Sequence, residues 1–199
     1  MIAEQYSKEL EEKFRKEESK GWMYPTTQGV LANKYPGTPV LVAALGAIPK
    51  PDGTVRPIHD GTHYVQVNNH IEIQDQLQYP GPHEAAGVMR ETLESKQSCF
   101  CISADIESAH RLVKIRECDH PLLACKADSS SKTIWVNTVG TFGISSAPFW
   151  WTRLFGIVGR MVAFIMGNAW CLQLVYVDDL HVSVAGEEKF HWLWMILAA

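Results

Sequence analysis

The sequence predicts a mixed fold, α+β or α/β, on two observations. Runs that favour strands alternate along the chain with runs that favour helices, which is typical of both classes. The 199 residues are 46% apolar and 20% charged, a composition typical of a globular protein. A chain of this length can bury a substantial core, so we expect one domain, or one domain with a small subdomain.

The N-terminal segment predicts a charged helix followed by an extended stretch. Ala3 to Lys20 mixes Glu and Lys, and Tyr6, Leu10 and Phe14 recur every four residues. This spacing predicts a solvated helix with one thin apolar stripe, whose charges are a solubilising surface. The segment from Gly21 to Pro39 contains three Pro and three Gly, which predicts an extended region rich in loops.

A hairpin is predicted next. Pro39 to Ile48 is an apolar run that favours a buried strand, and an Asp-Gly pair within residues 51–54 favours a turn. Val55 to Asp60 would be the returning strand, and Pro57 restricts it to an edge or a bulge because proline cannot donate to a ladder. Gly61 to Pro82 is rich in Asn and Gln and predicts irregular structure.

The remaining chain alternates between the two element types. One helix is predicted to carry four apolar residues on one side, namely Ala85, Val88, Met89 and Leu93. The predicted helices are His83–Ser95, Pro148–Gly167 and a last helix from Glu187 to Ala199. The predicted strands are Ser98–Ala104, Thr133–Asn137, Leu172–Val177 and Leu180–Val184. The apolar region from Phe155 to Val177 includes Arg160, Asn168 and Gln173, so we do not expect it to span a membrane.

Charge and cysteine content restrict the possible partners and the compartment. The net charge is −4, so a nucleic acid would have to be held by a local basic patch or through metal ions. Five Cys are present, an odd number, and the close pair Cys99 and Cys101 fits no common zinc spacing. These features predict reduced thiols, and the charged N-terminus predicts no signal peptide, so an intracellular protein is expected.

Two adjacent acids interrupt two strand-forming runs. Asp178 and Asp179 lie between Leu174–Val177 and Leu180–Val184, with no Gly, Asn or Pro beside them. An ordinary surface turn is poorly matched by this composition. Two carboxylates this close require cations, a metal or protonation to neutralise them. An exposed Asp-Asp loop that ends a strand remains the alternative.

A third acid, Asp105, also follows directly on a predicted strand. Acids at the ends of neighbouring strands can converge on one hard cation such as Mg²⁺, which keeps coordination positions open for phosphate oxygens. Two such ions would hold the attacking and leaving oxygens of a phosphoryl transfer. Alternatively, Asp105 caps a helix that begins at Ser108 and Ala109.

Four motifs in this order resemble reverse transcriptases, most closely those of retrotransposons. They are Ile48–Asp60, similar to the fingers hairpin of that family, Asp105-x-x-x-Ala109, Thr141–Pro148 and Tyr176-Val177-Asp178-Asp179. The resemblance implies an α+β fold: a right-hand palm, with an antiparallel sheet and helices packed on one face, and partial fingers. The implied division is an N-terminal helix and lead-in (1–38), a fingers-like segment (39–97) and a palm (98–199). The chain is expected to stop before the thumb.

The resemblance also implies template-directed DNA synthesis, in which a dNTP is added to a primer 3′-hydroxyl. In that reading, Asp105 and Asp178 are direct ligands of two Mg²⁺ ions, with Mn²⁺ as a possible substitute, and Asp179 is a less direct partner. The implied partners are a primer–template nucleic acid and a dNTP, and no membrane.

The same resemblance assigns a nucleotide-binding set. Lys50 and Arg56 match basic positions that contact the triphosphate, which agrees with the anion chemistry of these side chains. Phe142 and Gly143 match the segment beneath the nascent base pair, and Ala109 belongs to the nucleotide-binding motif. The alternatives are that Lys50 and Arg56 are solvated residues beside a turn and that Phe142 is a core aromatic.

His110 departs from the family pattern. Its position usually holds Tyr or Phe, which excludes the ribose 2′-hydroxyl. The edge of a His ring can hydrogen-bond a hydroxyl, so we expect weaker discrimination against ribonucleotides. Alternatively, His110 packs against a helix and touches no sugar.

Three other functions remain open. The chain could be a non-catalytic remnant of a retroelement that folds as a palm and binds nucleic acid. It could also copy RNA from RNA, since adjacent acids on a hairpin recur in such polymerases. A metal-dependent nuclease would use the same acids, but it would not require the Lys50–Arg56 hairpin. The net charge of −4 is unusual for a polymerase.

Overall fold

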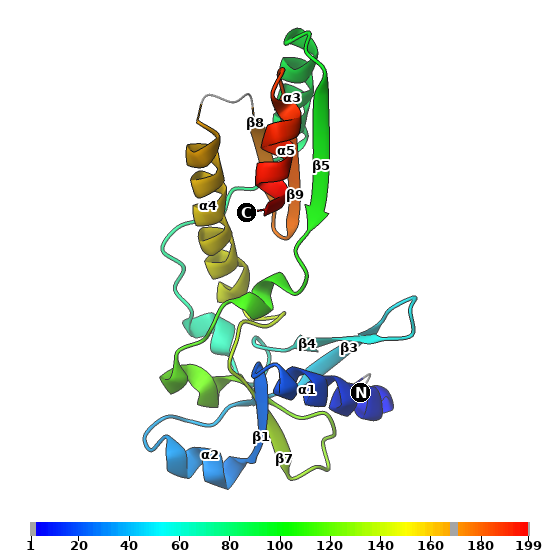
Figure 1. Ribbon diagram of the computed structural model, residues 1–199. Helices are drawn as coiled ribbons and strands as arrows, with labels where there is room; N and C mark the ends of the chain where they lie inside the picture. Colours follow the sequence, from blue (N-terminus) through cyan, green and yellow to red (C-terminus); the bar gives the residue numbers. More distant parts are fainter. Residues whose placement is uncertain (1–2, 168–170, 199) are drawn as a thin grey trace. The chain divides into compact units, whose positions relative to one another are not determined.

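The computed structural model describes residues 3–167 and 171–198, and the chain forms two compact units (Figure 1). Unit 1 consists of Met1–Gln74 and His110–Pro148, and unit 2 consists of Asp75–Ala109 and Phe149–Ala199. Each unit therefore combines segments that are distant in the sequence. The division into 1–38, 39–97 and 98–199 remains a prediction.

Unit 1 contains a four-stranded sheet with the strand order β1-β7-β6-β2. The β2–β6 pair is parallel and the other two pairs are antiparallel. A charged helix, α1 (Ser7–Ser19), follows a short 3-10 helix, η1 (Ala3–Tyr6), and a second helix is α2 (Gln28–Lys34). The strands are β1 (Met23–Thr27), β2 (Val42–Ala43), β6 (Ala124–Cys125) and β7 (Thr133–Asn137).

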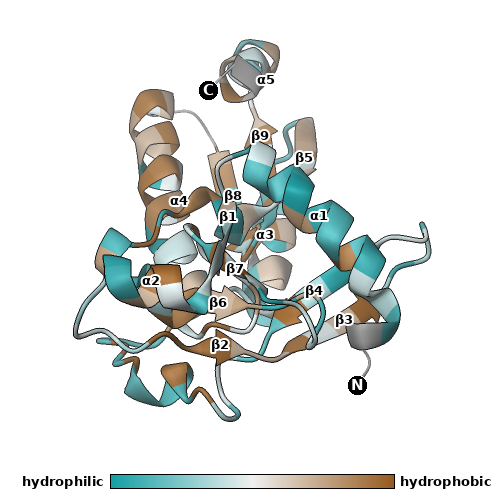
Figure 2. Ribbon diagram, turned by 90° about the horizontal axis from the view of Figure 1, so that it is seen from below, coloured by the Kyte–Doolittle hydropathy of each residue, from teal (hydrophilic) through white to brown (hydrophobic). Residues whose placement is uncertain are grey.

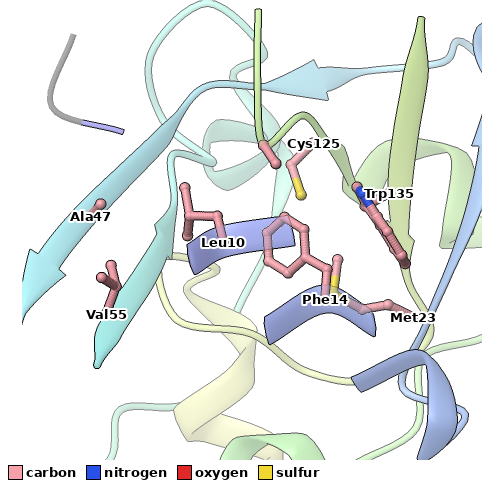
Figure 3. Packing of buried hydrophobic residues seen from close by; sticks show 8 residues of the cluster. Leu10, Phe14, Met23, Ala47, Val55, Cys125 and Trp135 are labelled. Atoms are coloured by element: carbon pink, nitrogen blue, oxygen red, sulfur yellow. The ribbon is translucent and has the colours of Figure 1, made fainter. Parts of the chain in front are cut away.

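The two faces of this sheet are covered by different helices. Trp135 of β7 packs with Leu10 and Phe14 of α1, in the cluster shown in Figure 3. The neighbouring β7 residues Ile134 and Val136 pack instead with Leu31 of α2. This alternation follows from the two-residue period of a strand. In Figure 2, the ribbon of α1 is mostly hydrophilic, as expected for a helix that buries one narrow stripe.

The predicted hairpin forms a separate two-stranded sheet in unit 1, from β3 (Leu45–Pro49) and β4 (Val55–His59). Pro57 is tolerated there because a two-stranded sheet consists only of edge strands. Three short 3-10 helices connect the segments of this region: η2 (Val67–His70), η3 (Ala109–Leu112) and η4 (Glu117–Leu123).

Unit 2 contains an antiparallel three-stranded sheet with the order β5-β9-β8. Val182 and Val184 of β9 are buried against Met166 and residues of two helices. The strands are β5 (Cys99–Asp105), β8 (Cys171–Tyr176) and β9 (Asp179–Ala185). The helices are α3 (Pro82–Glu94), α4 (Ser146–Met166), whose first three residues belong to unit 1, and α5 (Lys189–Ala198).

The α+β class is confirmed, and most elements were predicted within a few residues of their observed bounds. The prediction of an extended, loop-rich Gly21–Pro39 was wrong, because β1 and α2 both lie there. Pro25 is accommodated since β1 is an edge strand, and the Thr27 hydroxyl caps α2 by accepting from the Val30 N–H at 3.4 Å.

Two further expectations were wrong. The predicted strand Pro39–Ile48 is interrupted at Ala44, so that β2 and β3 belong to different sheets. The apolar side predicted for residues 83–95 does not form a buried face, because Met89 is 68% and Leu93 79% exposed. The last predicted helix exists as α5, and Ala199 lies outside the described residues.

The expectation that the apolar region of the chain does not span a membrane remains a prediction. Among the described residues, one helix, α4, is long enough and apolar enough to cross a membrane, judged by length and composition. Of its most apolar 18-residue stretch, 17% is buried. Core helices of soluble proteins meet the same criterion, so this is weak evidence. All five cysteines are free, and the reduced state of their thiols remains a prediction.

Candidate active site

The adjacent acids lie at the tip of a tight hairpin in unit 2. Tyr176 at the end of β8 pairs with Asp179 at the start of β9, so Val177 and Asp178 form a two-residue turn. Val177 has a φ of 56°, in the left-handed region that two-residue hairpin turns require. The apolar runs on either side thus form two paired strands, and the turn brings both acids to one end of the sheet.

Asp105 lies directly opposite Asp179 in the β5–β9 ladder. Directly opposed residues in an antiparallel pair project from the same face, with Cβ atoms about 4.5–5.5 Å apart. The Asp178 carbonyl accepts a hydrogen bond from the Ile106 N–H at 2.9 Å, which continues the contact beyond the end of β5. The register therefore opposes Asp105 to Asp179, which the sequence analysis expected to be the less direct partner, whereas Asp178, expected to be a direct ligand, lies in the turn.

A hollow of about 690 Å³ borders this acid pair. Asp105 and Asp179 are both exposed, and within residues 3–167 and 171–198 neither they nor Asp178 form a salt bridge. The two acids are thus accessible from a concave surface. Its lining is Pro80, Gly81, Pro82, Ala85, Ser103, Ala104, Asp105, Leu174, Tyr176, Asp179, Leu180 and His181, all in unit 2.

The carboxylates fit an open Mg²⁺ site and not a closed protein cage. In the part of the chain that the structure describes, no group of three or more His, Cys, Asp or Glu side chains could hold a metal. Mg²⁺ is commonly held by one or two carboxylates, with waters and substrate phosphates as the other ligands. Asp105 and Asp179 provide such a pair on one face of the sheet.

His181 is a polar residue of this hollow that the sequence analysis did not select. It lies two residues after Asp179 on β9 and opposite Ser103 on β5, so it shares the face of the acids. Its Nδ1 is 3.1 Å from the Ser103 hydroxyl, and its Nε2 is 3.5 Å from the Ser183 hydroxyl. The two-residue spacing from Asp179 is the sequence signal that could have identified it.

In unit 1, three of the predicted nucleotide-binding residues lie together around one ring. The Arg56 guanidinium carbon is 5.4 Å from the centroid of Phe142, and the His110 ring meets the same ring edge-on at 4.9 Å. Phe142 is 37% exposed, so it is not a core aromatic. Lys50 is exposed at the turn of the β3–β4 hairpin, to which Arg56 also belongs. The backbone N–H of Lys50 donates to the Thr54 carbonyl at 2.8 Å.

Gly143 is held against the backbone of β4. Its φ is +95°, and a Cβ at this position would lie 1.8 Å from the His59 carbonyl oxygen. The preceding carbonyl, of Phe142, accepts from the His59 N–H at 3.0 Å. Only glycine combines this φ with such a close approach, which explains the residue at this position.

The amide side chain of Asn68 fixes the same segment from η2. It donates to the Gly143 carbonyl at 2.8 Å and to the Thr62 hydroxyl at 2.9 Å, and its oxygen accepts from the Ser145 N–H at 2.9 Å. The sequence analysis missed Asn68, because an Asn in an irregular, Asn-rich stretch has no distinguishing pattern.

Two buried titratable residues, Arg111 and His59, border this ring cluster. Arg111, the neighbour of His110, donates to Glu17, to the Asn137 side chain at 2.7 Å and to the Gly140 carbonyl. Burial lowers the pKa of Arg111, and the charge of Glu17 opposes that effect. Burial also lowers the pKa of His59 to about 4, so this imidazole is neutral at pH 7. A neutral ring is the form expected for a His that is 2% exposed.

The predicted site residues are divided between the two units. Asp105, Asp178, Asp179 and the buried Ala109 belong to unit 2, and the boundary between the units falls between Ala109 and His110. The unit 1 group comprises Lys50, Arg56, His110, Phe142 and Gly143.

A comparison with known protein families gives a match. A family model described as reverse transcriptase (RNA-dependent DNA polymerase) matches residues 48–198. No curated protein matches the chain. The matched residues include the end of β3 from Ile48, the whole of β4, the acid hairpin and the Phe142–Gly143 segment.

Proposed function

Because the chain belongs to the reverse transcriptase family, we propose that it copies an RNA template into DNA by adding a dNTP to a primer 3′-hydroxyl. The source is a retroelement of the retrotransposon type, and the setting is intracellular. The β5-β9-β8 sheet of unit 2 is the palm, and the β3–β4 hairpin of unit 1 belongs to the fingers.

The observation that carries this proposal is the register that opposes Asp105 and Asp179 beside the hollow of unit 2. We infer that these two carboxylates would hold Mg²⁺, for which Mn²⁺ can substitute, and that Asp178 would join them as a ligand when two ions and the dNTP phosphates are bound. The bound ions would lower the pKa of the primer hydroxyl and neutralise charge on the departing pyrophosphate. The protein's part is to fix the carboxylates on adjacent strands, so that little reorganisation is needed during the reaction.

The unit 1 group supplies the contacts to the dNTP. Arg56 donates in a bidentate manner to phosphate oxygens, and Lys50 acts as a point charge beside it. Phe142 offers a flat apolar face to the nascent base pair, and Gly143 permits a close approach of the backbone. The cation–π contact between Arg56 and Phe142 supports a common role, because it links the phosphate-binding and base-binding residues.

Primer extension with a primed RNA template, dNTPs and Mg²⁺ tests the proposal. Incorporation is expected for the wild-type chain, and Asp178→Asn should reduce it by at least about 10³-fold, since removal of a metal ligand removes charge stabilisation in the transition state. Asp128→Asn is the matched control. Asp128 is half-buried in a unit 1 loop and accepts from Ser130, so this variant should retain incorporation.

Two outcomes would contradict the proposal. If the wild-type chain binds the primed template but incorporates nothing at any Mg²⁺ or Mn²⁺ concentration, it is a non-catalytic palm module that binds nucleic acid. If it prefers ribonucleotides to dNTPs, it copies RNA from RNA.

A further inference from the structure

The turn that carries the catalytic acids has an unfavourable backbone conformation. Val177 adopts a φ of 56°, where a β-branched side chain crowds the backbone. Two-residue hairpin turns usually place Asn, Asp or Gly at such a position. Because this conformation is energetically unfavourable for Val, contacts from the surrounding structure must stabilise it.

One side chain of α4 contacts this turn directly. The indole Nε1–H of Trp151 donates to the Val177 carbonyl oxygen at 2.7 Å. Trp151 is 3% exposed, and its ring stacks on Phe155, one turn further along α4, at 5.1 Å and 14°. The stacking and burial fix the orientation of the indole, so its N–H is directed at one carbonyl of the turn.

The orientation of the Val177 carbonyl affects the position of the acids. It belongs to the peptide group that joins Val177 to Asp178, and the next carbonyl, of Asp178, accepts from the Ile106 N–H beside Asp105. A rotation of the first peptide plane would therefore displace Asp178 and weaken the contact with β5. Residue 176 is held independently, since the ring of Tyr176 packs on Tyr79 at 5.2 Å.

We propose that Trp151 is a positioning residue for the acids: its indole N–H holds the strained Val177–Asp178 peptide group in the orientation that directs Asp178 and Asp179 toward Asp105. This inference rests on the proposed polymerase function. A Gly at position 177 would avoid the backbone strain. With Val at this position, the hydrogen bond from the indole offsets the strain and connects the hairpin to α4.

Trp151→Phe tests this role because it removes the N–H donor but keeps an aromatic ring at position 151 that can stack on Phe155. We expect kcat for dNTP incorporation to fall about 10–100-fold, as a displacement near 1 Å can do, with KM for dNTP within about twofold. Trp150→Phe is the matched control. Trp150 is 56% exposed and packs edge-on with Phe149, so both constants should stay within about twofold of wild type.

A rescue variant separates positioning from packing. Glycine adopts a positive φ without strain, so Val177→Gly added to Trp151→Phe should restore kcat to within about fivefold of wild type. If Trp151 acted only through core packing, the added change would leave kcat low. Absence of rescue would therefore overturn the proposal, as would a Trp151→Phe loss no larger than that of Trp150→Phe.

Amide hydrogen exchange, measured by NMR on the Ile106 N–H without metal or nucleotide, provides a readout independent of activity. Trp151→Phe should accelerate this exchange at least about fivefold, since the Asp178 carbonyl would no longer be held, and Val177→Gly should reverse the effect. If the wild-type chain incorporates no dNTP, the proposed function fails and the exchange rates still decide the role of Trp151. Unchanged Ile106 exchange in Trp151→Phe would reject it.

Discussion

The two turns that carry candidate site residues solve the same steric problem in different ways. Both require a positive φ, at Gly143 in unit 1 and at Val177 in unit 2. In the first, glycine removes the strain, and the His59 backbone occupies the space that a Cβ would need. In the second, a β-branched residue keeps the strain, and the Trp151 indole binds the turn. The comparison teaches that a glycine has opposite value at the two turns. Replacing Gly143 by a larger residue should add backbone strain, whereas replacing Val177 by glycine should relieve it.

Gly143→Ala should produce the largest effect. The φ alone costs about 1–2 kcal/mol for alanine, and the new Cβ would overlap the His59 carbonyl, so β4 and the turn must separate. We expect a loss of more than about 3 kcal/mol in the free energy of unfolding, measured by urea denaturation.

Gly53→Ala is the control for this prediction. Gly53 has a φ of +78°, and nothing lies within 4 Å of the position of its Cβ, so this variant isolates the conformational cost of about 1–2 kcal/mol. Equal losses in the two variants would show that the close approach to His59 contributes nothing.

Asn68→Ala should have the next largest effect. Three hydrogen bonds of one side chain connect η2 to Thr62, Gly143 and Ser145. Their loss should destabilise the protein by about 2 kcal/mol and, because the Phe142–Gly143 segment is released, raise KM for dNTP more than it lowers kcat. Steady-state primer extension and urea denaturation measure the two effects.

The neighbouring Asn69, which is exposed, supplies the control. Asn69→Ala should change stability by less than about 0.5 kcal/mol and leave KM unaltered. If Asn68→Ala destabilised the protein without any change in KM, the hydrogen bonds of Asn68 to the Phe142–Gly143 segment would not affect nucleotide binding.

Features that depend on the local pattern could be predicted from the sequence. The β8–β9 hairpin was predictable because two β-forming runs flank a short polar break, and α1 because apolar residues recur every four positions. The motif order Asp105, Phe142-Gly143, Asp178-Asp179 was sufficient to indicate the family that the matching model describes. These signals depend only on residues that are close in sequence, or on the order of motifs.

Features that depend on distant partners could not be predicted. β1 contains Pro25 and was expected to be a loop, and its strand character comes from pairing with β7, more than 100 residues later. Trp151 has the appearance of an ordinary core aromatic in an apolar helix, and only the hydrogen bond to Val177 distinguishes it. Similarly, nothing near Asn68 in the sequence indicates the carbonyl of Gly143.

His110→Phe should produce the smallest effect, on selectivity and not on stability. The ring of His110 is 8% exposed and contacts Phe142 edge-on, a contact that Phe can reproduce. Loss of the ring nitrogens removes a hydrogen-bonding partner for a ribose 2′-hydroxyl, so the preference for dNTP over rNTP should rise about 3–10-fold, equivalent to about 1 kcal/mol. The ratio of kcat/KM for the two nucleotides measures this preference. His120→Phe, at a half-buried ring near Tyr24, is the control, and equal ratios for wild type and His110→Phe would show that His110 packs within unit 1 without contacting the sugar.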